Sequence, residues 1–140
     1  MKAKIRLIVV LVSAVMLFSC KSLFPAAGTT VECNGQLLKP ILNPTKRAEF
    51  PGGRQAMSTY FKTNLILPKE AINRKGKVKA AFIVTKNGEI CDLRIISKPN
   101  KYVDKAVIQV IKMMPKWIPG INEGKIVDCY FLLAIRFYIE

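Results

Sequence analysis

The side chains able to carry chemistry in this 140-residue chain are four cysteines and nine carboxylates, and there is no histidine. Histidine is the usual catalytic base and the commonest metal ligand, so Ser–His or Cys–His nucleophiles and His-containing zinc sites are excluded. No two carboxylates stand at a functional spacing on one expected element. Neither catalytic residues nor a metal site is therefore expected, and the chain is predicted to be no enzyme and to need no cofactor.

Cys20 is the cysteine with the most informative surroundings. Lys2, Lys4 and Arg6 precede the apolar run 7–18, which is shorter than the roughly 20 residues needed to span a bilayer. This is the pattern of a secretory signal peptide. Its end, Leu17-Phe18-Ser19-Cys20, resembles the lipobox of bacterial lipoproteins, which implies cleavage before Cys20 and acylation of that residue. The alternative is an ordinary signal peptide with a chance cysteine.

The net charge of +14 would suit a nucleic-acid binder, but secretion places the chain in the cell envelope. Removing residues 1–19 takes away three positive charges and leaves +11, which can meet anionic headgroups or simply keep the domain soluble. No nucleic-acid partner is expected. Lys21 is not the aspartate that retains some lipoproteins at the inner membrane, so we expect an outer-membrane anchor with the domain in the periplasm.

Cys33, Cys91 and Cys129 are the other three cysteines, and an odd number of thiols leaves their pairing open. The envelope permits disulfides. Cys91 and Cys129 fall on the apolar sides of expected strands, and the favoured interpretation is that they are small buried hydrophobic residues.

Three segments of the chain are predicted: a signal peptide over residues 1–19, a lipidated tether over 20–49 and one folded domain over 50–140. Within the domain, helical spacing of apolar residues predicts a helix after Gly53 and another from Val103 to Met114. Pro68 suits the first position of a short helix between them.

Three strands are predicted by alternation of side chains, at 78–85, 89–97 and 126–138. Asn87-Gly88 predicts a hairpin turn in which both central residues take positive φ. Cys91, Leu93 and Ile95 are expected on the core face. The elements predict an α+β, two-layer sandwich, with a three-stranded antiparallel sheet in the order 2-1-3 and two main helices on one face.

These landmarks together resemble the C-terminal domain of TonB, in the version common in Bacteroidetes-type bacteria. The resemblance covers residues 50–140, and the pieces that carry it are Phe50-Pro51-Gly52-Gly53 with Ala56, Leu67-Pro68 with Ala71, Gly76-Lys77-Val78, Phe82-Ile83-Val84 before Asn87-Gly88, Asp104, Met114-Pro115-Lys116-Trp117-Ile118-Pro119-Gly120 with Gly124-Lys125 and Val127, and Ile135-Arg136-Phe137. Trp117 is expected to plug the end of the core, and Asp104 to serve as a helix-start charge.

The resemblance implies a periplasmic domain that adds an extended segment of an outer-membrane receptor to its sheet edge. In the expected order the last strand is that edge, and its candidate partner-binding side chains are Tyr130, Leu132, Ala134, Arg136 and Tyr138. The chain lacks the inner-membrane helix and long Pro-rich span of a TonB proper, so force transduction is not expected.

Two hypotheses follow. In the first, the chain is a lipid-anchored module that binds a TonB-dependent receptor or another envelope protein. In the alternative, it is a structural or assembly lipoprotein that forms a homodimer or packs into an envelope complex.

Overall fold

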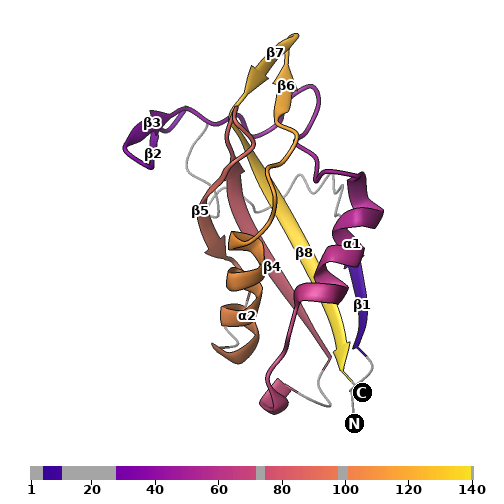
Figure 1. The fold of residues 1–140 in the computed structure, drawn as a ribbon. Coiled ribbons are helices and arrows are strands. Elements are labelled where there is room, and N and C mark those ends of the chain that lie inside the picture. The colour runs from indigo at the N-terminus through magenta and orange to yellow at the C-terminus, as the bar shows by residue number, and fades with distance from the viewer. Residues whose placement is uncertain (1–4, 11–27, 72–74, 98–100, 140) are drawn as a thin grey trace.

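The computed structural model describes residues 5–10, 28–71, 75–97 and 101–139 (Figure 1). Residues 1–4, 11–27, 72–74, 98–100 and 140 lie outside this description, and the predictions for Cys20 and the rest of its lipobox fall among them. The elements in chain order are β1 Ile5–Val10, β2 Val31–Cys33, β3 Gln36–Leu38, α1 Gly53–Asn64, η1 Lys69–Ala71, β4 Lys75–Val84, β5 Ile90–Ile95, α2 Lys101–Lys112, β6 Gly120–Asn122, β7 Lys125–Val127 and β8 Cys129–Ile139.

The main sheet has four antiparallel strands in the order β1-β8-β4-β5. The α+β class and the antiparallel pairing are confirmed, whereas the expected three-stranded sheet is wrong. The three expected strands are neighbours within the sheet, and β1 is added outside β8. The last strand is consequently not an edge strand in the full-length chain.

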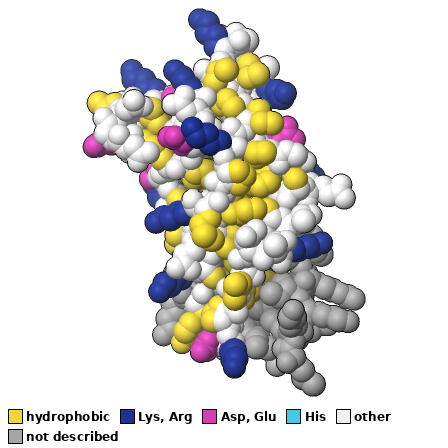
Figure 2. Space-filling model, viewed as in Figure 1, with side chains coloured by type: hydrophobic (Ala, Val, Ile, Leu, Met, Phe, Trp, Pro, Cys, Tyr) yellow, Lys and Arg dark blue, Asp and Glu magenta, His cyan; other side chains and the backbone are white. Residues whose placement is uncertain are grey.

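Helices α1 and α2 lie in front of the sheet in Figure 1, and the core fills the space between them and one sheet face. Helix α1 buries Met57 and Phe61, and α2 buries Val103, Val107 and Ile111. Asp104 lies in the first turn of α2, where a carboxylate is stabilised by the positive end of the helix dipole. From the helix side, hydrophobic side chains form a strip along the middle of the surface (Figure 2).

Trp117 is buried within this core. It is only 3% exposed, and its ring centroid lies 4.7 Å from that of Phe131, 5.4 Å from Phe82 and 5.8 Å from Phe50. The three contacts are edge-on, the arrangement that aromatic quadrupoles favour. The tryptophan is thus a packing residue.

The segment expected as a tether is attached to the domain over much of its length. Ala48 belongs to the core, and backbone hydrogen bonds join Ile41 to Asp128, Lys46 to Ile121 and Glu49 to Ile118. Residues 41–49 therefore form part of the folded unit rather than a free linker before it.

The turn between β4 and β5 differs from the expected one. Thr85 and Glu89 bracket three loop residues, the Gly88 N–H donates to the Thr85 carbonyl at 2.8 Å, and only Gly88 takes positive φ, at 79°. This is the three-residue hairpin loop with glycine in the left-handed position. The Trp117 N–H in turn donates to the Gly88 carbonyl at 2.8 Å, so the loop is held next to the buried Trp117.

Strand β5 contains a bulge that changes which face Cys91 occupies. Ala81 pairs with Arg94 and Ile83 pairs with Cys91, so an advance of two residues along β4 corresponds to three residues along β5. Asp92, within that stretch of β5, takes a positive φ of 50°. An extra residue moves the following side chains to the opposite face. Leu93 and Ile95 pack on the core as expected, but the expectation that Cys91 does so is wrong.

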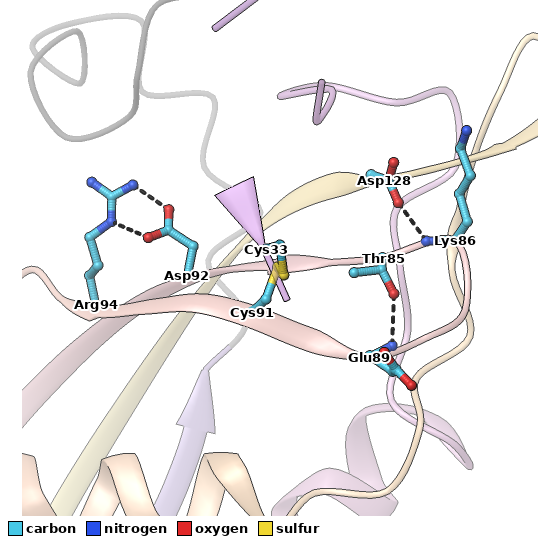
Figure 3. Close-up of a disulfide and its surroundings, with 8 residues drawn as sticks. All are labelled: Cys33, Thr85, Lys86, Glu89, Cys91, Asp92, Arg94 and Asp128. Carbon is cyan, nitrogen blue, oxygen red and sulfur yellow. Dashed lines mark hydrogen bonds and ion pairs between the residues drawn. A yellow bond between two sulfur atoms is a disulfide. The ribbon is translucent and has the colours of Figure 1, made fainter. Parts of the chain in front are cut away.

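Cys91 instead forms a disulfide with Cys33, with the two Cα atoms 6.1 Å apart (Figure 3). The expectation that Cys91 is a free, buried thiol is therefore also wrong. Cys129 is free and fully buried, as expected, and burial raises the pKa of its thiol. The bond ties the β2–β3 hairpin to β5.

We predict that Gly88→Ala destabilises the domain far more than Gly124→Ala. Both glycines have positive φ, which costs an alanine about 1–2 kcal/mol. An added Cβ at Gly88 would lie 2.1 Å from the Trp117 carbonyl oxygen, whereas at Gly124 it meets nothing within 4 Å. Urea unfolding should show a difference of at least about 2 kcal/mol, because fixed backbone cannot move aside cheaply. Equal losses in the two variants would contradict the close approach of Gly88 to Trp117.

We predict that the double variant Cys33→Ser, Cys91→Ser loses about 4 kcal/mol of unfolding free energy. The bond closes a loop with a sequence separation of 58, and the chain-entropy model gives about this value for that length. Dithiothreitol should lower the melting temperature of the wild type and leave that of the double variant unchanged. A wild type indifferent to dithiothreitol would argue against the disulfide.

Candidate partner-binding edge of the sheet

The long edge of β8 is defined by backbone groups that point away from β4. The Tyr130 N–H donates to the Ile41 carbonyl at 3.0 Å, on the side opposite β4. Backbone direction alternates along an antiparallel strand, so every second residue offers its N–H and C=O on this side. We call the backbone groups of these residues the outward edge; they belong to Tyr130, Leu132, Ala134, Arg136 and Tyr138.

Two segments of the chain occupy parts of the outward edge. Ile41 bridges to the start of β8 in parallel, and β1 pairs antiparallel with its second half, from Val10 opposite Ala134 to Ile5 opposite Ile139. Leu132 lies between these two segments. Strand β1, which has six residues, thus pairs with β8 in a regular register.

The described side chains of the outward edge, those of Tyr130, Leu132, Ala134 and Arg136, lie on the sheet face away from α1 and α2, which we call the outer face. Ala134 is buried, Tyr130 and Leu132 are half-buried and Arg136 is exposed; the side chain of Tyr138 lies outside the description. Burial raises the pKa of the Tyr130 hydroxyl, and the negative charge of Asp92 adds to this effect. All five residues belong to β8, and their role in binding a partner stays a prediction.

The other end of the outer face carries a groove beside the disulfide, with a volume of about 600 Å³. Its walls include the β2–β3 hairpin and the loop after β4. Asp128 is 8% exposed and accepts a 2.7 Å hydrogen bond from the Lys86 N–H, and the Thr85 hydroxyl accepts one from the Glu89 N–H at 3.1 Å (Figure 3). These polar groups hold the loop, so they have a structural role.

Metal-binding chemistry finds no support in the described part of the chain, where no three Cys, Asp or Glu residues gather. Within the same residues, no helix has both the length and the apolar character to cross a membrane.

The two small hairpins were missed by the sequence analysis, although both carry a signal. Asn34 and Gly35 have φ of 51° and 79°, and Glu123 and Gly124 have φ of 50° and 76°. Two successive positive φ values define the type I′ turn, for which Asn-Gly is the favoured pair. The Asn34-Gly35 pair would have predicted the hairpin that presents Cys33, but nothing in the sequence predicts the bulge that turns Cys91 toward it.

Comparison with known families supports the interpretation of the fold. The family described as Gram-negative bacterial TonB protein C-terminal matches residues 64–139, more than half of the chain. The match begins at the end of α1, so Phe50–Gly53 and Ala56 lie outside it. No curated protein matches this chain. Domains of this family are non-enzymatic and interact with cell-envelope proteins such as TonB-dependent receptors. The chain belongs to the family of Gram-negative bacterial TonB C-terminal domains.

Proposed function

We propose that the chain is a lipid-anchored envelope module that captures an extended segment of another envelope protein, such as a TonB-dependent receptor, by adding it as a strand to β8. The observation that carries the proposal is the antiparallel pairing of β1 with Ala134–Ile139. That pairing demonstrates a register in which β8 accepts a further strand. Main-chain hydrogen bonds then supply affinity, and alternate side chains supply selectivity.

Maturation is the step that frees the edge in this proposal. Cleavage between Ser19 and Cys20 removes β1 together with the rest of residues 1–19. The core cluster from Ala48 to Phe137 lies in the part of the chain that this cleavage leaves. The outward edge from Leu132 to Tyr138 then has unpaired N–H and C=O groups, which attract an extended chain.

The anchor is the acylated Cys20, in the outer membrane, with the domain in the periplasm. More than one acyl chain gives stable attachment. The proposed module holds its partner near the membrane that carries the acyl chains.

We predict that Leu132→Pro weakens strand capture and Leu132→Ala does not. Proline removes an N–H that points away from β4, so the β4–β8 hydrogen bonds survive, whereas alanine removes the same side chain and keeps the N–H. Binding of synthetic peptides from receptor N-termini to the mature chain should fall about tenfold in the proline variant, the effect of about one lost hydrogen bond.

The precursor provides the matched control for this measurement. Full-length chain that retains β1 should bind the same peptides more weakly than the mature chain. Equal binding by precursor and mature chain, or by both Leu132 variants, would count against capture on β8. A tight dimer of the mature chain in sedimentation, abolished by Leu132→Pro, would instead support the alternative of a self-associating structural lipoprotein.

We predict that Cys20→Ser releases the protein from membranes. The anchor depends on acyl chains at Cys20, and each buried methylene contributes about 0.8 kcal/mol to attachment. Mass spectrometry of the wild-type protein should find a diacyl or triacyl adduct on Cys20 as the first residue. A mature N-terminus downstream of residue 20 without an adduct would refute lipidation.

A further inference from the structure

Three cations form a cluster on the outer face, near the end of β8. Lys77 on β4 lies directly opposite Arg136 on β8, and Lys79 lies opposite Ala134, diagonal to Arg136. All three side chains are exposed. We call Lys77, Lys79 and Arg136 the basic cluster.

The pairing geometry brings these charges close together. The backbone groups of Arg136 point away from β4, so Arg136 and Lys77 are a non-hydrogen-bonded pair, the type in which side chains approach most closely. Like charges directly opposite each other destabilise a sheet. In agreement, the pKa of the Lys77 ammonium is lowered, by burial first and then by the charges of Lys79 and Arg136.

No carboxylate in the described part of the chain offsets the basic cluster. The ion pairs found there join Arg94 to Asp92 and Lys116 to Glu89, and neither includes a member of the cluster. On the helix-bearing side, by contrast, Lys and Arg side chains are spread around the hydrophobic strip (Figure 2). The concentration of unpaired charge on the outer face therefore fits an anionic surface.

The disulfide brings the chain from Cys20 onto this same face. Cys91 lies opposite Ile83, on the outer face, and holds Cys33 there. The chain between Cys20 and Cys33 can span about 45 Å at most. Ile83 and Lys77 are six residues apart on β4, about 20 Å along the strand. The basic cluster is hence within reach of the membrane that holds Cys20.

We propose that the basic cluster binds the anionic lipid headgroups of the membrane in which the chain is anchored. The outer face then lies toward the bilayer, and α1 and α2 face away from it. The geometry of this proposal rests on the anchor at Cys20 in the proposed function, but binding by the cluster needs no acyl chain and no peptide partner.

The test is vesicle co-sedimentation of the mature chain, residues 20–140, carrying Cys20→Ser. Vesicles of phosphatidylcholine alone are compared with vesicles containing phosphatidylglycerol. We expect binding only to the anionic vesicles, with affinity that falls as salt rises. The variant Lys77→Gln, Lys79→Gln should bind about 25-fold more weakly, about fivefold for each charge removed near the surface.

The matched control is Lys62→Gln, Lys112→Gln, which removes two exposed charges from α1 and α2 and gives the same net charge. It should bind within about twofold of wild type, and thermal unfolding should show that both variants are folded. Equal weakening of the two double variants, equal binding to both kinds of vesicle, or no binding of the wild type would each overturn the proposal. Because the unacylated chain is used without peptide, these outcomes are independent of lipidation and strand capture.

Discussion

The antiparallel pairing of β4 with β8 is the interaction on which the rest of the structure depends. It runs without a break from Lys75 opposite Tyr138 to Val84 opposite Cys129. One set of alternate side chains, from Val78 to Val84 and from Cys129 to Phe137, makes the floor of the core on which both helices pack. A register slip of one residue would turn that entire set to the other face, so burial of this set fixes the register.

The same alternation determines where function can lie. Residues of β8 that hydrogen-bond to β4 face the core, and those whose backbone points outward have side chains on the outer face. The backbone groups of the outward edge consequently lie beside the side chain of Arg136 and the side chains opposite it on β4. A ligand strand on β8 and a charged surface near Lys77 would meet at Arg136, so the two proposed interactions are neighbours on the protein.

Much of the fold could be predicted from the sequence because it depends on local periodicity. The apolar stripes of α1 and α2, the alternation in β4 and β8, and the buried Trp117 between two prolines all follow from side-chain spacing. The division of β8 into a core-facing set and an outer-face set of side chains likewise follows from alternation. The disulfide could not be predicted, because the bulge at Asp92 reverses the face of Cys91 and depends on tertiary pairing. Pairing of β1 with β8 was missed for another reason: an apolar run after three cations is typical of a signal peptide, and such a run also has the composition of a strand.

The two strands that end the sheet once residues 1–19 are removed differ in how well they can accept a further strand. Strand β5 has six residues, is interrupted by a bulge, carries the Arg94–Asp92 ion pair and is tied to the β2–β3 hairpin by a disulfide. Short length, bulges and charges are the features by which proteins protect edges from pairing. Strand β8 has eleven residues in regular register with an apolar middle. Strand β1 pairs with the second half of β8, and β1 belongs to the segment that maturation would remove. The asymmetry favours strand addition on β8 over strand addition on β5.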